Sequence, residues 1–291
     1  MEIFLIAQPP FSLTAVIRSH GWVQLAPFET DQNYSTIETI LELGSGSVVE
    51  LLIWERPDGV GVFSDPPLTD AEQAEVEQKV SWMLDLEQDL STFYAWAAAE
   101  PKLAGAASHA RGRILRCPTL FEDILKTIAT TNTTWGGTKR MVRALVKTYG
   151  AALSSDPSRR AFPTPQRLAA ADAEALRRES KLGYRAPYIL ELAQRVAAGE
   201  LDVEALKSKD LPTPELRKRL LAIKGVGDYA AANLLMILGR YDYIPVDSWA
   251  LKMVSNEFYH GEAIGRKEVE ATFQPWGEWQ GLAFWLWDWS D

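Results

Sequence analysis

The chain has 291 residues, of which 47% are hydrophobic and 24% are charged, and its formal net charge is −9. This length and apolar content exclude a disordered chain and allow two domains with cores of their own. No apolar run reaches the roughly 20 residues of a membrane span, and the single cysteine, Cys117, excludes an internal disulfide and a four-cysteine iron–sulfur cluster.

The negative charge is confined to one part of the chain. Residues 1–110 hold 4 Lys/Arg and 17 Asp/Glu, whereas the remainder holds 26 Lys/Arg and 22 Asp/Glu. Within residues 111–150, eight bases stand against only Glu122 and Asp123. The second part of the chain can therefore present a phosphate-binding face despite the acidic total. Any one of these bases can equally belong to an ordinary solvated helix surface.

Residues 11–65 show the alternation and the turn signals of an antiparallel sheet. The pattern predicts strands within FSLTAVIRSHGW (11–22), STIETILELG (35–44), VVELLIWERPDG (48–59) and VGVFS (60–64). Glycine, serine and proline at 44–47 and 57–59 mark turns between them.

From Thr69 onward the sequence predicts helices. Thr69 and Glu72 form a capping box that starts a helix running to about Trp82. Further helices are predicted near 90–98, at 119–130, at 135–149 and from about 185, with a short one around Pro163 and Pro165 and a glycine/alanine-rich connector at 104–112. After Pro118 we expect almost no strand.

The stretch from residue 211 to 252 carries the most specific pattern. Thr213 is expected to cap a helix over 215–222, with Pro214 at its first position, and Asp228 to cap a helix over 229–238. Between them Gly225-Val226-Gly227 forms a tight hairpin. Such a hairpin aims backbone N–H groups at a phosphate without reading base identity. The alternative is an ordinary helical hairpin followed by a surface aspartate, Asp247.

The two helices, the hairpin and the Pro-Val-Asp at 245–247 together resemble the signature of the helix-hairpin-helix/GPD superfamily of DNA glycosylases. Two further segments are similar to 8-oxoguanine DNA glycosylases, PTLFEDILKTIATTNTTWGG (118–137) and KLGYRAPYI (181–189). The resemblance implies an α+β fold with an N-terminal antiparallel β-domain and flanking helices at 1–112. An all-helical glycosylase domain would follow at 113–291.

The resemblance also implies how the duplex is opened, because an enzyme acting on a base must take it out of the stack. Asn132 would fill the gap left by the flipped base, Tyr184 would wedge beside the unpaired partner base, and Arg185 would hydrogen bond that base. Each alone could instead be a turn asparagine, a core tyrosine or a solvated arginine. The remaining implied DNA contacts are Gly225, Val226, Gly227, Lys139 and Arg140.

Asp247 is the implied catalytic carboxylate, and one departure from the family decides the expected chemistry. Bifunctional members carry a lysine at the position that Tyr229 occupies here, and tyrosine cannot form a Schiff base. We therefore expect hydrolysis of the N-glycosidic bond without β-lyase activity, as in 3-methyladenine DNA glycosylase II. Lys139 is the one substitute amine considered.

The positions of the family's base pocket also differ. Phe284, Asn233 and Asp288 stand at or near those of its guanine-reading glutamine, pocket cysteine and pocket phenylalanine, and Trp249 replaces a histidine. The expected pocket thus comprises Trp249, Phe284, Asn233, Tyr229 and Trp279. Trp249, Trp276, Trp279, Trp285 and Trp287 together suggest a wide aromatic pocket for a cationic alkylated purine, although core packing is the alternative for each.

No metal or organic cofactor is expected, although backbone carbonyls of Leu221, Ile223 and Val226 could hold a monovalent cation. The expected partner is double-stranded DNA with a damaged base, bound by a monomer away from any membrane. The N-terminal MEIFLIAQPPFSL lacks the features of a signal peptide, so we expect a cytoplasmic protein, nucleoid-associated if bacterial. Two alternatives remain open: an 8-oxoguanine-type glycosylase with a rebuilt pocket, and a non-catalytic binder of damaged DNA that has no use for Asp247.

Overall fold

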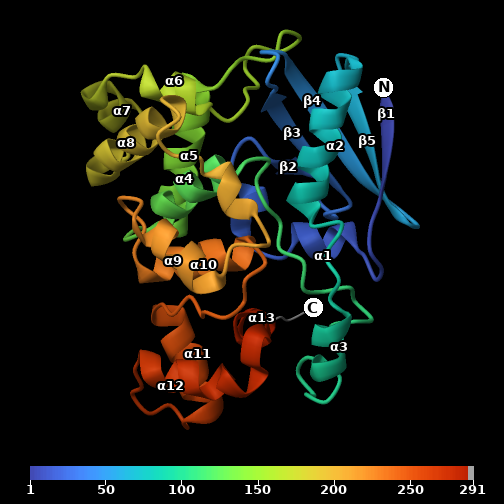
Figure 1. Cartoon of the computed structure of the whole chain (residues 1–291), viewed down its shortest axis with the longest axis vertical. Coiled ribbons are helices and arrows are strands. Elements are labelled where there is room, and N and C mark those ends of the chain that lie inside the picture. The colour runs from blue at the N-terminus through green and yellow to red at the C-terminus, as the bar shows by residue number, and fades with distance from the viewer. Residues whose placement is uncertain (288–291) are drawn as a thin grey trace. The chain divides into compact units, whose positions relative to one another are not determined.

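The computed structural model describes residues 1–287 and divides the chain into two compact units (Figure 1). Unit 1 comprises Met1–Asp89 and Arg113–Lys207, and unit 2 comprises Leu90–Gly112 and Ser208–Asp291. The excursion Leu90–Gly112, which the sequence assigned to the β-domain, thus belongs to the compact unit that carries the hairpin. The domain division at residue 112 stays a prediction.

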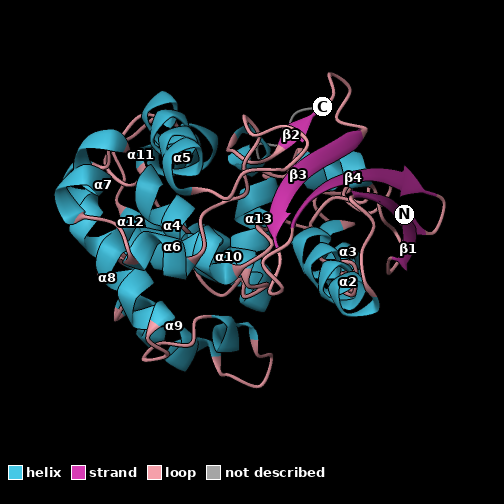
Figure 2. Cartoon of the chain, turned by 90° about the horizontal axis from the view of Figure 1, so that it is seen from above, coloured by secondary structure: helices cyan, strands magenta, loops and turns pink. Residues whose placement is uncertain are grey.

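A five-stranded antiparallel sheet opens unit 1 (Figure 2). Its order is β1-β5-β4-β3-β2, with β1 at Glu2–Ile6, β2 at Glu29–Thr30, β3 at Thr36–Glu42, β4 at Val48–Arg56 and β5 at Gly59–Asp65. Ile37, Ile53, Val62 and Ile3 lie opposite one another across four strands, and all four are buried. This row marks the core face of the sheet.

Helix α2 (Asp70–Leu84) begins at the predicted capping box, in which Thr69 and Glu72 cap each other. It buries Val76, Val80 and Met83, and both views of unit 1 place it against the sheet (Figures 1 and 2).

The predicted strand at residues 11–22 is wrong. That segment forms α1 (Leu13–Ile17) and the 3-10 turn η1 (Gly21–Gln24). The Ser12 hydroxyl accepts from the backbone N–H of Ala15, and the Glu55 carboxylate accepts from that of Leu13 at 2.7 Å. These two caps outweigh the strand preference of the β-branched residues. The missing strand is supplied by β1.

The remainder of unit 1 is helical and confirms the predicted helices at 119–130 and 135–149. Thr119 and Thr134 cap the first two of these helices by accepting from backbone N–H groups three residues on. The elements are α4 (Leu120–Thr130), α5 (Trp135–Tyr149), α6 (Pro165–Ala169), α7 (Ala173–Glu179), η2 (Gly183–Arg185), α8 (Ala186–Ala197) and η3 (Glu204–Lys207). Among the described residues after Pro118, pairing of the β type is limited to an isolated bridge between Ala152 and Arg160.

Unit 2 is helical throughout its described part. Its elements are α3 (Ser91–Ala97), α9 (Thr213–Leu221), α10 (Asp228–Ile237), α11 (Ser248–Phe258), α12 (Arg266–Phe273), η4 (Gln274–Trp279) and α13 (Gln280–Leu286). Aromatic rings make much of its core: Phe273 meets Phe284 edge-on at 5.5 Å between centroids, and Phe93 lies 5.6 Å from Trp279. The predicted α+β class, an antiparallel sheet followed by helices, is confirmed. Within residues 1–287 no helix has the length and apolar character needed to cross a membrane.

Candidate active site

The Gly-x-Gly hairpin connects α9 to α10 in unit 2. Gly225 has φ +90°, in the left-handed region that favours glycine, so the turn requires it. Gly227 has φ −95°, and nothing lies within 4 Å of the place that a Cβ would take. Gly227 therefore serves no internal packing, and it leaves the N-terminal end of α10 open to an anion such as a phosphate.

The predicted caps of the hairpin helices are each displaced by one residue. Helix α9 already includes Thr213 and has Pro212 as its cap, and α10 already includes Asp228 and has Gly227 as its cap. The Asp228 carboxylate forms an ion pair with Arg217 of α9. Since this pair occupies the side chain, Asp228 joins the two hairpin helices rather than capping the second.

Asp247 is held firmly at the start of α11. It is the cap residue of that helix, and its Oδ1 accepts from the backbone N–H of Ala250 at 2.8 Å. Its other oxygen, Oδ2, has no hydrogen-bond partner among residues 1–287. The helix dipole at this end favours the ionised carboxylate. The side chain is half-buried, so one oxygen is fixed and the other is available to a substrate or a water.

Tyr229 and Asn233 lie with Asp247 in unit 2. Burial and the negative charge of Asp247 raise the pKa of the Tyr229 phenol, and a hydrogen bond with the Asn233 side chain opposes that rise. The Asn233 amide also donates to the Tyr229 carbonyl at 3.0 Å. The position of the family's amine is thus filled by a protonated phenol next to the carboxylate, which offers a hydrogen-bond donor but no nucleophilic nitrogen.

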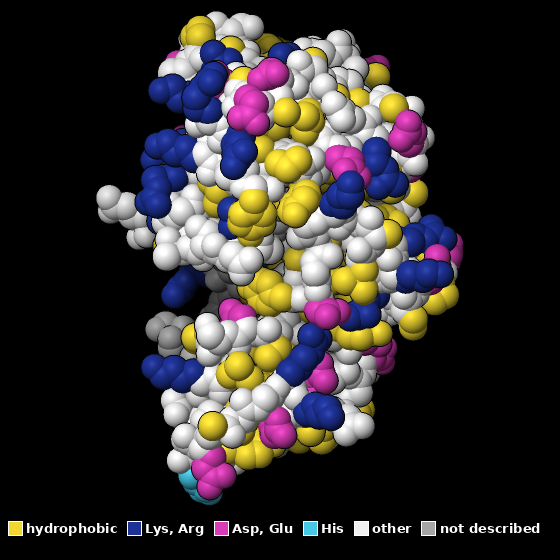
Figure 3. Space-filling view, turned by 90° about the vertical axis from the view of Figure 1, so that its left-hand side faces the viewer, with side chains coloured by type: hydrophobic (Ala, Val, Ile, Leu, Met, Phe, Trp, Pro, Cys, Tyr) yellow, Lys and Arg dark blue, Asp and Glu magenta, His cyan; other side chains and the backbone are white. Residues whose placement is uncertain are grey.

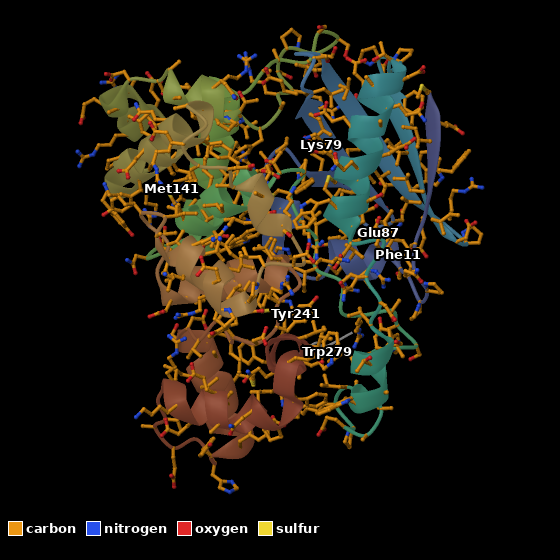
Figure 4. All side chains as sticks on the ribbon, in the orientation of Figure 1. Phe11, Lys79, Glu87, Met141, Tyr241 and Trp279 are labelled. Carbon is orange, nitrogen blue, oxygen red and sulfur yellow. The ribbon has the colours of Figure 1, made fainter. Side chains whose placement is uncertain are left out.

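The expected pocket residues differ in exposure. Trp249 is 47% exposed on α11, and its ring meets that of Phe284 edge-on at 6.0 Å. Phe284 is only 1% exposed and packs in the core. Trp279 stacks on Tyr241 with centroids 5.6 Å apart, as the side-chain view also shows (Figure 4). Of this set, Trp249 offers the exposed aromatic face.

Other tryptophans also take packing roles. Trp276 lies 6.3 Å from Phe93, and Trp287 lies 5.3 Å from Phe273. A cavity of about 70 Å³ lies in unit 1, where Phe121, Phe162 and Pro163 are among the residues that line it, so it involves none of the tryptophans. Asp288 lies outside the described residues, and a wide aromatic pocket stays a prediction.

The three residues implied in duplex opening come together in unit 1. Asn132 forms the turn between α4 and α5 with φ +45°, and its side-chain amide donates to the Tyr184 hydroxyl at 3.2 Å. Tyr184 is 48% exposed. Hydrogen bonds from Thr131 and Asn132 and the charge of Arg185 lower the pKa of its phenol. The exposed ring and the exposed amide therefore share one surface.

Arg185 is buried directly beneath this surface. Its guanidinium donates to the Thr131 carbonyl and lies 4.5 Å from the centroid of the Tyr184 ring. Its Nη1 also lies 4.0 Å from the sulfur of Met141, labelled in Figure 4. In this structure the arginine therefore braces the turn that carries Asn132.

Sequence reasoning missed a brace at the start of α5. The Gln24 amide oxygen accepts from the Trp135 indole N–H at 2.9 Å and from the Lys139 amine at 3.4 Å. The Trp135 ring also lies against Gly21, where a Cβ would overlap it. No local signal identifies Gln24, because its partners lie more than 100 residues away. Arg140, by contrast, is exposed.

Three of the eight bases in residues 111–150 are buried and structural. Arg113 donates to the backbone carbonyls of residues 8, 10, 85 and 88, Arg116 pairs with Asp85 at 2.7 Å, and Lys126 pairs with Glu122 at 2.6 Å. The phosphate-binding face expected from the composition is therefore smaller than the count suggests.

Within residues 1–287 no cluster of His, Cys, Asp and Glu could hold a metal ion. In the hairpin loop, the Ile223 carbonyl accepts from the Val226 N–H at 3.0 Å. A monovalent cation on the carbonyls of Leu221, Ile223 and Val226 stays a prediction.

Comparison with known proteins was made on this basis. Residues 125–278 match the family described as HhH-GPD superfamily base excision DNA repair protein. A DNA-3-methyladenine glycosylase of Bacillus subtilis is 26% identical over 229 residues, 76% of this chain and 74% of the relative. A probable N-glycosylase/DNA lyase of Methanothermobacter thermautotrophicus is 26% identical over 240 residues, 75% of each chain.

Two solved structures share the fold. The 3-methyladenine DNA glycosylase of Archaeoglobus fulgidus aligns with a TM-score of 0.77 at 21% identity, covering 99% of this chain and 97% of its own. The 8-oxoguanine glycosylase/lyase of Clostridium acetobutylicum, in complex with DNA, aligns with a TM-score of 0.72 at 22% identity, covering 95% and 90%.

Proposed function

Because the chain belongs to the HhH-GPD superfamily of base excision DNA repair proteins, and is a DNA glycosylase of that class, we propose that it is monofunctional. It hydrolyses the N-glycosidic bond of a damaged base, first of all an alkylated purine, and leaves the strand uncut. The observation that carries this proposal is the carboxylate of Asp247 beside the phenol of Tyr229, at the position where bifunctional relatives hold an amine.

The chemistry needs only one carboxylate and water. As the bond from the sugar C1′ to the base nitrogen breaks, the base leaves with the electron pair and the sugar becomes cationic. The ionised Asp247, oriented by the Ala250 N–H, stabilises that charge. Its free oxygen accepts a proton from a water, whose oxygen then bonds to C1′. Tyr229 can donate a hydrogen bond but cannot attack C1′ as an amine.

An alkylated purine suits this site for two reasons. Such bases carry positive charge, and an exposed aromatic face such as that of Trp249 attracts a cation by about 0.5–2 kcal/mol. Their glycosidic bonds are already weakened, so a single carboxylate suffices. The 3-methyladenine glycosylase relative of Bacillus subtilis supports the same class.

The proposed DNA contacts follow the two exposed surfaces. Gly225, Val226 and Gly227 hold a phosphate, while Asn132 and Tyr184 fill the opened step and Arg185 contacts the unpaired base. Contacts from Lys139 and Arg140 add charge attraction. We expect a monomer that works in the compartment holding the DNA, the cytoplasm and nucleoid if the source is bacterial.

A panel of duplexes, each with one modified base, tests the proposal. Released base and strand cleavage are measured with and without alkali. We expect release of an alkylated purine, intact strands before alkali and no adduct after borohydride treatment. Release of 8-oxoguanine alone would instead assign the rebuilt 8-oxoguanine pocket, and tight binding without any release would assign the non-catalytic binder. An adduct that disappears in Lys139→Gln would show lyase chemistry and name its nucleophile.

A further inference from the structure

The exposed bases of α5 form a line that starts beside the Asn132 turn. Arg140, Arg143 and Lys147 are exposed. With 3.6 residues per turn, positions 140, 143 and 147 lie one above another on a single side of the helix. The opposite side is buried, and it carries Met141, Val142, Leu145 and Val146.

These three charges are unbalanced within the protein. Helix α5 contains no acidic residue, and none of the three bases forms an ion pair within residues 1–287. The nearby carboxylate of Glu179 on α7 is already occupied, because it accepts from the Tyr149 hydroxyl at 3.3 Å and lies 3.8 Å from Arg178.

A line of like charges is an unfavourable arrangement for a helix alone. Bases three or four positions apart on one helix face destabilise it by a few tenths of a kcal/mol for each pair. The other bases of this sequence region with comparable length are buried and paired, as described for Arg113, Arg116 and Lys126. The α5 line is thus the part of the basic region that remains for an external anion.

The surface between these bases is low. Gly136 and Ala144 lie on the same side of the helix, so a bulky ligand can approach its backbone. The Arg140 guanidinium reaches back over the first turn, where a Cβ at Gly136 would lie 3.5 Å from its Nη1. Figure 3, which views the left-hand side of Figure 1, shows Lys and Arg side chains gathered at its upper left.

We propose that Arg140, Arg143 and Lys147 bind successive phosphates of a DNA strand that continues from the opened base pair along α5. This rests on the proposed function, which places Asn132 in that pair. The seven positions from 140 to 147 rise about 10 Å. One DNA strand carries a phosphate per about 3.4 Å of helix axis, so the line matches about three phosphates.

The test measures the salt dependence of binding to a short undamaged duplex. The variant replaces Arg140, Arg143 and Lys147 by Gln. Each lost phosphate contact lowers the slope of log K against log salt by about 0.9, so the slope should fall by roughly 2 to 3. Between about 50 and 200 mM salt the parent should then lose about 40-fold more affinity than the variant.

The control removes the same number of charges elsewhere. Arg18→Gln, Arg56→Gln and Lys79→Gln together change the net charge equally in unit 1 and should leave the slope at the parent's value. Thermal unfolding checks that both variants fold. An α5 variant with the parental slope, or with the slope of the control, would overturn the proposal. Because the duplex is undamaged, this result is independent of whether the parent releases a base.

Discussion

The two compact units place their charged groups differently. Unit 1 buries seven charged side chains, and these are Asp85, Arg113, Arg116, Glu122, Asp123, Lys126 and Arg185. In unit 2, the described residues up to 287 bury none, and aliphatic and aromatic side chains fill the core. Unit 1 therefore depends on exact pairing of polar groups, whereas unit 2 depends mainly on buried apolar area.

This difference separates stability from chemistry. The carboxylate of Asp247 is half-buried and has a free oxygen, so unit 2 can lose its charge without losing its core. The buried pairs of unit 1 have no such freedom, because a charge left alone in a protein interior is costly. Changes at ionisable residues should consequently affect activity in unit 2 and folding in unit 1.

Asp247→Asn should show the largest effect. We expect base release to fall by about 10³-fold or more, equivalent to about 4 kcal/mol of barrier, because the carboxylate acts on the cationic transition state. The Asn side-chain oxygen can still cap α11, so thermal unfolding should match the parent. Affinity for a duplex with an abasic-site analogue should also be preserved. Undiminished base release would remove Asp247 from the mechanism.

Lys126→Met should destabilise unit 1 by about 3 kcal/mol, because it leaves the Glu122 carboxylate buried and unpaired. Denaturant unfolding measures the loss. Adding Glu122→Leu should recover most of it, since a buried pair can be replaced by apolar residues at little cost. If the double variant is no more stable than Lys126→Met, the pair is not what stabilises this part of unit 1.

Asp123 should make folding sensitive to pH. Burial raises the pKa of its carboxyl from 3.8 to about 7, against hydrogen bonds from Trp22 and Cys117. The folded state therefore keeps the proton while the unfolded state loses it. The contribution to stability is complete below about pH 4 and is lost as the pH rises towards 7.

The loss between pH 5 and 6.5 should be about 2 kcal/mol relative to Asp123→Asn, which does not titrate. Free energies of unfolding of both proteins across this range measure it, and taking their difference removes the contributions of the other carboxylates. Parallel curves for the two proteins would show that Asp123 is ionised in the folded state throughout.

Gly227→Val should have the smallest effect, a loss of about tenfold in DNA affinity, or about 1.4 kcal/mol. Its φ is compatible with a side chain and the space around it is empty, so folding should be unaffected. The loss should be equal for damaged and undamaged duplexes, because a phosphate contact carries no base information. A loss restricted to damaged duplexes would place the hairpin at the base instead.

Local signals in the sequence predicted the elements whose ends are determined locally. Thr119 and Thr134 begin two helices by capping N–H groups three residues on, and Gly225 forms the hairpin turn. The segment 11–22 was mispredicted because one of its two caps, the carboxylate of Glu55, comes from another strand. A helix start that depends on tertiary contacts has no local signature.

The site was predictable only in part for the same reason. The resemblance named Asn132 and Tyr184, and the structure joins them across 52 positions of sequence. It could not predict that Arg185 would be buried beneath them, or that Gln24 would brace α5. Both contacts depend on distant backbone or side-chain atoms, and a charged residue gives no sign in sequence of whether such atoms will surround it.

The position of Arg185 has a consequence for how the protein searches DNA. Its guanidinium already holds the Thr131 carbonyl, so a contact with an unpaired base is an exchange of one acceptor for another. The free energy gained is only the difference between the two hydrogen bonds. An intact base pair, which presents no free acceptor edge, gives nothing in return for breaking the first bond. On undamaged DNA the arginine therefore stays withdrawn, and the protein can move along the duplex without being held at each pair.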